Sequence, residues 1–270
     1  DTEVDAHEAV HEVRKRCKKI RGLVRLVRPA FPGYSAANAR FRDLARELAP
    51  IRDATTLLEA FDMLMGRVET VVRADAFASV RAVLRDRRDT IAEDLDASAR
   101  LDAVRADLQE AAAAAEAWDL DDGGADAVVH GLGRTFRRAT AAMAEAYDGS
   151  GDGPAAERFH EWRKRVKYHR YHARLLRRMW DPVLDPWRDE AKRLSDLLGD
   201  DHDLTELRAV LAREADRFED ADLPLLHALI DLRQEELRRA ARPLGRKLFA
   251  EKSRHHVRRH AALWRAWRAA

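Results

Sequence analysis

The sequence contains few of the residues that stop helices and almost none that could form disulfides. Among its 270 residues are 12 glycines, 8 prolines and a single cysteine, Cys17. One cysteine excludes a disulfide within the chain and is typical of a reducing compartment. No apolar run approaches the roughly 20 residues that would cross a bilayer, and the first residues lack the basic and apolar regions of a secretory signal. We therefore expect a cytoplasmic protein that does not span a membrane.

Strand signals are lacking as well, because no stretch of alternating β-branched residues lies between turn residues. Hydrophobic residues make up 46% of the chain and charged residues 36%, which favours long helices with charged outer faces. We therefore expect an all-α protein. The first apolar stripe at helical spacing consists of Val10, Val13, Cys17, Ile20, Val24 and Val27.

Proline and glycine divide the expected helices. The first helix should end at Pro29, and a second should run from Ser35 to Leu48, where Pro50 stops it. Residues 148–154 form the clearest linker. A third helix should begin near residue 53, and a long helix should cover 75–118, with a break near 97–101. The helix before the linker should end at residue 147. After the linker, helices are expected at 155–180, 186–198, 203–219, 223–249 and 253–268.

Part of the sequence occurs twice. Residues 11–18 (HEVRKRCK) match residues 160–167 (HEWRKRVK), and the same offset pairs later arginines. With a slip of one residue, Leu48–Asp53 matches Leu198–Asp203. This internal duplication predicts two pseudo-symmetric helical bundles, residues 1–150 and 151–270.

The repeated helix carries basic residues within an arc of roughly 120° on a helical wheel. An exposed helix face ordinarily mixes signs, whereas the nearest acids, Glu12 and Glu161, lie off this arc. The net charge is only +2, so the clustering, and not the bulk charge, points to a polyanion. The alternative is a solvated helix face. The basic arcs consist of His11, Arg14, Lys15, Lys18, Arg21 and Arg25, and of His160, Arg163, Lys164, Lys167, Arg170 and Arg174.

Rows of arginine and lysine suit a ligand with regularly repeated negative charge. Arginine can hold two phosphate oxygens at once, and lysine adds a mobile point charge. Basic residues one helical turn apart are separated by about 5.4 Å along the axis. Linear polyphosphate fits this spacing, and so does a nucleic acid backbone.

These motifs resemble the CHAD domain, the conserved histidine α-helical domain. The resemblance rests on His11-x-x-Arg14 with the run from Lys18 to Arg25, and on His160-x-x-Arg163 with the run from Lys164 to Tyr171. It implies two bundles whose basic helices face a shared central groove or pore, binding of inorganic polyphosphate and, in some members, association with polyphosphate granules. On the same resemblance, the expected site also includes Lys19, Arg42 and Lys192.

The chain departs from the family's pattern at three points. Ala49-Pro50 replaces an expected glycine, and His202 stands where asparagine is common. The Glu-x-Glu-x-Lys signature of the triphosphate-tunnel domain that accompanies many members does not occur in the sequence. These differences change a turn and the domain context more than the basic faces.

Two other classes remain open: a nucleic-acid-binding helical protein and a scaffold that binds other proteins. Nucleic acid binding predicts aromatic residues among the basic ones, and the arcs offer only Tyr168 and Tyr171. The chain lacks a phosphate-binding Gly-x-x-x-x-Gly-Lys loop and a Gly-x-Ser-x-Gly elbow. We therefore expect a binding protein without catalytic activity and without a cofactor.

A metal site is not expected either. His7 and His11 lie four residues apart, but the neighbouring basic residues repel a cation. The acidic run from Asp200 to Asp203 could hold Mg²⁺, although capping of a helix is the simpler interpretation. Two further expectations concern ring side chains. His255, His256 and His260 could extend the basic surface or lie on an exposed terminal helix. The bundle cores and their mutual interface should be filled by Trp162, Trp180, Trp187, Trp264 and Trp267.

Overall fold

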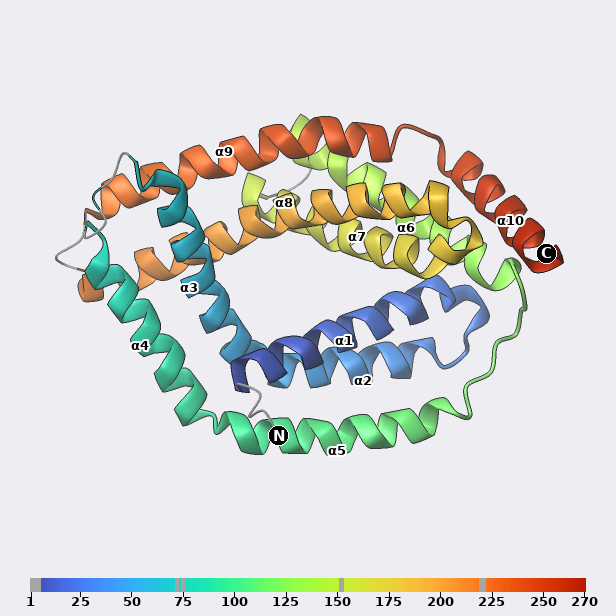
Figure 1. Cartoon of the computed structure of the whole chain (residues 1–270), viewed down its shortest axis with the longest axis horizontal. Coiled ribbons are helices and arrows are strands. Elements are labelled where there is room, and N and C mark those ends of the chain that lie inside the picture. The colour runs from blue at the N-terminus through green and yellow to red at the C-terminus, as the bar shows by residue number, and fades with distance from the viewer. Residues whose placement is uncertain (1–5, 71–72, 74–75, 151–152, 219–221) are drawn as a thin grey trace. The chain divides into compact units, whose positions relative to one another are not determined.

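The computed structural model describes residues 6–70, 73, 76–150, 153–218 and 222–270, and within these ranges all regular structure is helical (Figure 1). This confirms the all-α expectation. The α-helices are α1 (Ala6–Leu26), α2 (Tyr34–Glu47), α3 (Ala49–Val68), α4 (Ala78–Asp94), α5 (Ala97–Ala115), α6 (Asp126–Asp148), α7 (Ala155–Leu176), α8 (Asp181–Arg213), α9 (Leu223–Leu248) and α10 (Ser253–Ala269). Short 3-10 helices are η1 (Arg28–Ala30), η2 (Arg177–Met179) and η3 (Ala215–Phe218).

The helix bounds follow the offset of the sequence repeat. Helix α1 begins at Ala6 and α7 at Ala155, and the 3-10 turns that follow them begin at Arg28 and Arg177. Both pairs have the same offset along the sequence as His11 and His160. The pseudo-symmetry of the two halves remains a prediction.

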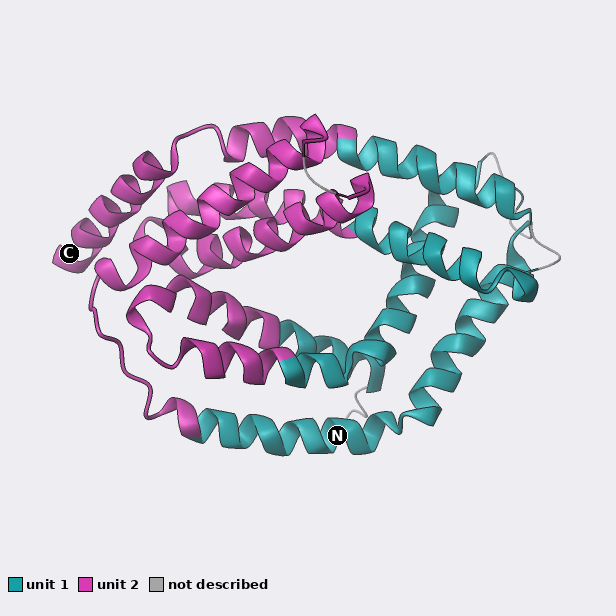
Figure 2. Ribbon diagram, turned by 180° about the vertical axis from the view of Figure 1, so that it is seen from behind, with its two compact units in different colours: residues 1–16, 43–113, 200–238 teal, residues 17–42, 114–199, 239–270 magenta. Residues whose placement is uncertain are grey.

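The chain forms two compact units, each assembled from three segments (Figure 2). Unit 1 contains residues 1–16, 43–113 and 200–238. Unit 2 contains residues 17–42, 114–199 and 239–270. Each unit therefore draws on both sides of the linker at 148–154. The division into halves 1–150 and 151–270 concerns the sequence repeat and remains a prediction.

Two of the expected helix boundaries are wrong. Helix α3 begins at Ala49, so Pro50 lies in its first turn, where its missing N–H is not needed. Helix α8 runs without interruption through residues 198–203, where a junction was expected, and it also includes Pro186. In both places the residue types favour a helix boundary, but the surrounding packing determines where the helix ends.

The expected break in the long helix lies between α4 and α5, at Leu95–Asp96. Asp96 has a positive φ of 43°, a left-handed conformation that aspartate adopts more readily than most residues. Its Oδ1 accepts a hydrogen bond from the N–H of Ala99 at 3.0 Å. Asp96 therefore ends α4 and caps the first turn of α5.

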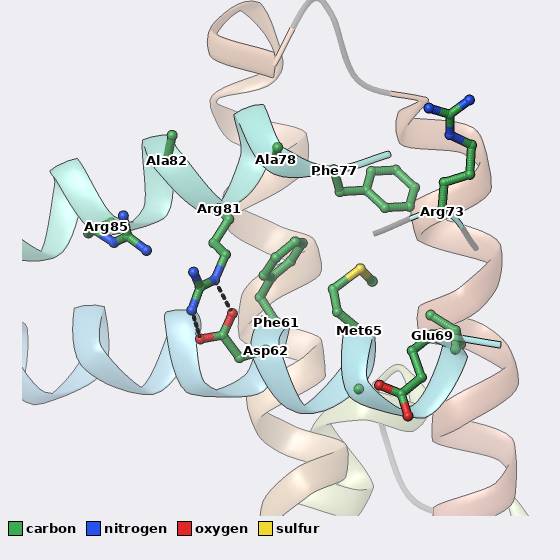
Figure 3. Close-up of a pocket in the computed structure, with 12 residues that line it drawn as sticks. Phe61, Asp62, Met65, Glu69, Arg73, Phe77, Ala78, Arg81, Ala82 and Arg85 are labelled. Atoms are coloured by element: carbon green, nitrogen blue, oxygen red, sulfur yellow. Dashed lines mark hydrogen bonds and ion pairs between the residues drawn. The ribbon is translucent and has the colours of Figure 1, made fainter. Parts of the chain in front are cut away.

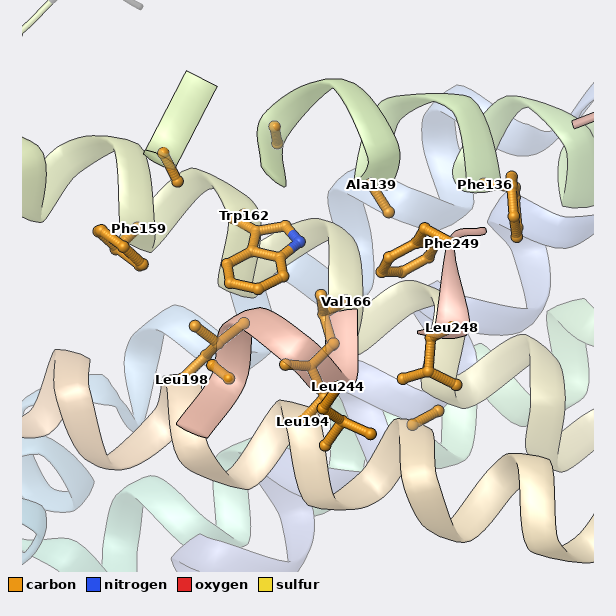
Figure 4. Close-up of a cluster of buried hydrophobic side chains, with 14 residues drawn as sticks. Phe136, Ala139, Phe159, Trp162, Val166, Leu194, Leu198, Leu244, Leu248 and Phe249 are labelled. Carbon is orange, nitrogen blue, oxygen red and sulfur yellow. The ribbon is translucent and has the colours of Figure 1, made fainter. Parts of the chain in front are cut away.

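The core of unit 2 lies among α6, α7, α8 and α9 (Figure 4). Trp162 is completely buried there, next to Val166 of the same helix. Its neighbours include Leu194 of α8 and Leu244 of α9. The expectation that tryptophan fills the core is thus confirmed for Trp162. It is wrong for Trp180 and Trp267, which are 51% and 41% exposed.

In unit 1, α3 and α4 pack against each other and bury Phe61 and Leu84. The end of α4 is joined to the end of α8 by an ion pair between Arg87 Nη1 and the Glu214 carboxylate at 2.5 Å.

Among the described helices, none is both long and apolar enough to cross a membrane.

Candidate anion-binding site

In unit 1, the predicted residue Arg14 points into the protein. Its side chain is almost fully buried, and its guanidinium donates to the backbone oxygen of Ala45. The same guanidinium forms an ion pair with Asp53 at 3.4 Å. In this arrangement Arg14 fastens α1 to the end of α2 and the start of α3.

His11 and Lys15, also in unit 1, are half-buried on the same helix. Lys15 forms an ion pair with Glu12. Burial lowers the pKa of His11 below its ordinary value, and the positive charges of Arg52 and Lys15 lower it further, while Glu12 opposes them. His11 is therefore neutral near pH 7, and a bound anion would raise its pKa.

In unit 2, the second half of α1 approaches α7 closely at Gly22. A Cβ at this position would lie 2.9 Å from the Cβ of Tyr171, so only glycine fits without a shift. His172 Nε2 lies 3.1 Å from the backbone oxygen of Gly22. One turn further on, the guanidinium of Arg25 lies over the ring of Tyr168, 4.3 Å from its centroid. This contact brings the basic residues of two predicted helices together.

Three predicted arginines gather at this contact. Arg21 and Arg25 both donate to Oδ1 of Asn38, at 3.4 and 3.1 Å. Burial lowers the pKa of Arg21, and Arg25 and Arg42 lower it further, with Tyr168 opposing them. The positive charges of Arg25 and Arg42 therefore act on Arg21, and Arg21 and Arg25 also share one neutral partner, Asn38.

The basic arc of α7 lies around His160. Burial lowers the pKa of His160, and Lys164, Arg163 and Lys167 lower it further. Glu161 opposes them through its negative charge, and its carboxylate also pairs with Lys164 at 2.5 Å and with Arg165. The sequence places Glu12 and Glu161 off the basic arcs, and in the structure each nevertheless forms an ion pair with a lysine of its arc.

A carboxylate from α8 also joins this face. Asp196 pairs with Arg170 of α7 at 3.3 Å and with Lys192 of α8 at 2.6 Å. The structure thus brings the predicted residues Arg170 and Lys192 to one place. Partly exposed pairs of this kind contribute about 0–1 kcal/mol to stability, so the fold depends little on them.

The remaining predicted residues lie on α1, α2 and α7 and are half-buried or exposed. Arg174 of α7 is exposed, as is Arg42 of α2. The half-buried members are Lys18, Lys19, Arg163 and Lys167.

Sequence reasoning missed a group of arginines on and near α6. Arg134 and Arg138, together with Arg28 and Arg165, line a small cavity with Arg25 and Tyr168. A signal was available in the sequence, because no acid lies three or four positions from Arg134 or Arg138. Their convergence with η1 and α7 depends on the fold.

The sequence patterns also did not predict a buried histidine cluster in unit 2. His169, His256 and His260 lie within a few ångströms of one another, with ring centroids 5.7 Å apart for the first two and 4.2 Å apart for the last two. Trp187 Nε1 donates to His169 Nε2 at 3.3 Å. His255 is exposed, but His256 and His260 are buried. The expectation that they extend the basic surface is wrong for these two.

No group of potential ligands that could hold a metal ion occurs among the described residues. His7 Nδ1 is 3.1 Å from the hydroxyl of Thr55. Asp201 is buried inside α8 and accepts from Arg238 Nε at 2.7 Å. The capping interpretation of the 200–203 run is wrong, because these residues lie in the middle of a helix.

A larger cavity, of about 480 Å³, lies between α3 and α4 in unit 1 (Figure 3). Its walls are mainly apolar, with Phe61, Met65 and Phe77, and Arg81 at its edge pairs with Asp62 at 2.6 Å. None of the predicted site residues lines it.

No curated protein and no solved structure matches the chain significantly. A family model does match it: the model described as the CHAD domain aligns with residues 2–212. This match takes in both copies of the histidine-containing motif, and on it the chain belongs to the CHAD domain family.

Proposed function

We propose that this protein binds inorganic polyphosphate, without cleaving it, through the basic residues of α1 and α7. The observation that carries the proposal is the contact at Gly22 in unit 2, where Arg25 lies over the ring of Tyr168 of α7 and shares Asn38 with Arg21. Membership of the CHAD domain family supports it. A cytoplasmic protein with this property would associate with polyphosphate granules.

The charge arrangement favours a flexible chain of phosphates as the ligand. The basic residues on α7 are spaced by helical turns, and several already hold exposed carboxylates, such as Glu161 and Asp196, that a stronger anion can displace. Nucleic acid is the competing ligand, because its backbone carries the same group. Stacking on bases would require accessible aromatic rings, and Tyr168 is already covered by Arg25.

The test is a calorimetric titration of the protein with long-chain polyphosphate at low and near-physiological salt, with duplex and single-stranded DNA as competitors. The test variant is Lys164→Gln with Arg174→Gln, two exposed residues of α7. Loss of two contacts worth about 1 kcal/mol each weakens binding by about 30-fold. The slope of log affinity against log salt should fall by about 1.4, at about 0.7 per contact for a single strand.

The matched control is Arg246→Gln with Lys247→Gln, which removes the same two charges from exposed positions of α9 in the same unit. It should leave affinity nearly unchanged. Equal losses in both variants would contradict the site. Polyphosphate and DNA binding that disappear together as salt rises would contradict the ligand.

A further inference from the structure

The small cavity in unit 2 is lined by guanidinium groups from four separate elements. Arg25 comes from the end of α1, and Arg28 from the turn η1 that follows it. Thr135 and Tyr168 complete the wall. The other three arginines are Arg134 and Arg138 of α6 and Arg165 of α7.

Two of the five arginines, Arg25 and Arg28, are held in place by neutral partners. Arg25 donates to Asn38 and lies over the ring of Tyr168, and Arg28 lies 4.5 Å from the centroid of Tyr34. Among the residues that the structure describes, Arg165 alone of the five has an ion-pair partner, Glu161. The cavity thus concentrates positive charge that the surrounding protein leaves largely unbalanced.

The repulsion inside the cavity acts most clearly on Arg138. Burial lowers its pKa first, and the charges of Arg165, Arg134, Arg28 and Arg25 lower it further. Elsewhere in the chain arginines pair with acids, as Arg87 does with Glu214. A bound anion would turn this repulsion into attraction at several guanidiniums at once.

The cavity's size restricts what that anion can be. Its volume is about 20 Å³, which is enough for about one water-sized group. A nucleobase or sugar does not fit, whereas one oxygen-bearing corner of a phosphoryl group does. The ligand must therefore concentrate charge in a small volume.

The end of a polyphosphate chain meets this requirement better than its middle. A terminal phosphoryl group carries nearly two negative charges at neutral pH, with a second pKa of about 6 for a phosphate monoester, whereas an internal one carries a single charge. We propose that the cavity formed by Arg25, Arg28, Arg134, Arg138 and Arg165 binds the terminal phosphoryl group of a polyphosphate chain. The inference rests on the proposed function, because Arg25 belongs both to the cavity and to the basic arc of α1, which would take the following phosphates.

The test compares two short polyphosphates of equal length by calorimetry. One has free ends, and in the other both terminal phosphates are converted to phosphoramidates with a small neutral amine. The wild-type protein should bind the free-ended chain about tenfold more tightly. Arg134→Gln with Arg138→Gln, both exposed residues, should abolish this preference and leave the affinity for the blocked chain within about twofold.

The matched control is Arg254→Gln with Arg258→Gln, two exposed arginines four residues apart on α10 of the same unit. It should keep the tenfold preference. Equal affinity of the wild-type protein for the two chains would overturn the inference without any variant, as would a preference that survives in Arg134→Gln with Arg138→Gln. If the wild-type protein bound neither chain, the proposed function itself would fail.

Discussion

Acid should destabilise unit 2 well before its carboxylates titrate, because the unit buries neutral histidines. Burial lowers the pKa of His169 to about 3, and those of His172 and His260 to about 4. His256 shifts in the same direction. In the unfolded chain each imidazole returns to an ordinary pKa of about 6.5. Between the folded and unfolded pKa values, the unfolded state binds more protons than the folded state. The contribution of these histidines to the unfolding free energy is therefore complete above pH 6.5 and is lost as the pH falls toward 4.

The size of the effect follows from linkage. Each pKa unit is worth about 1.36 kcal/mol, so one such histidine costs about 2 kcal/mol of unfolding free energy between pH 7 and pH 5. His169, His172 and His260 together cost about 6 kcal/mol, a large part of a typical domain's stability of about 5–15 kcal/mol.

Urea unfolding followed by far-UV circular dichroism at several pH values between 7 and 5 measures this loss. His172→Gln keeps a donor toward the backbone oxygen of Gly22 but cannot titrate, so the slope of unfolding free energy against pH should fall by about one proton. His255→Gln, at an exposed position, should leave the slope unchanged. A flat profile between pH 7 and pH 5 in the wild-type protein would refute the reasoning.

Three further outcomes are expected. Gly22→Ala should cost about 1–3 kcal/mol of stability in thermal melts, through overpacking against Tyr171, and should weaken polyphosphate binding in calorimetry. An unchanged melting temperature and an unchanged affinity would contradict the close contact. Trp162→Ala should cost about 3–5 kcal/mol in urea unfolding, since its side chain is fully buried. Burial and then the nearby cations lower the pKa of His160, and a bound polyanion should raise it. Binding should therefore tighten from pH 8 to pH 6 with proton uptake, and His160→Gln should reduce that uptake, measured by calorimetry in buffers of different ionisation enthalpy.

The exposed ion pairs on the basic face have a functional consequence. Glu161 and Asp196 screen Lys164, Arg170 and Lys192 in the free protein, which limits the repulsion that folding must overcome. In the proposed complex, a polyanion would replace these carboxylates as the counterions of the three basic side chains. The arginine cavity differs, because only Arg165 has a carboxylate partner there among the described residues.

The sequence by itself determined the helical class and the content of the basic arcs. Helical periodicity depends only on which residues recur every three or four positions, and Val10, Cys17 and Val24 of the expected apolar stripe are buried as that rule requires. Breaks that a local interaction produces were also predictable, as at Asp96, which caps its own helix. A local rule failed at residues 198–203, where buried Asp201 has its partner Arg238 on α9.

Only the tertiary structure decided which charges meet. The ion pairs of Arg14 with Asp53 and of Arg170 with Asp196 join residues on different helices, and no pattern along the chain specifies them. The arginine cavity needs α6 beside α1 and α7, an arrangement set by packing, including the close approach of Gly131 to the backbone of Leu26. Periodicity places a side chain on a helix face, but the partner of that face depends on how helices distant in sequence pack together.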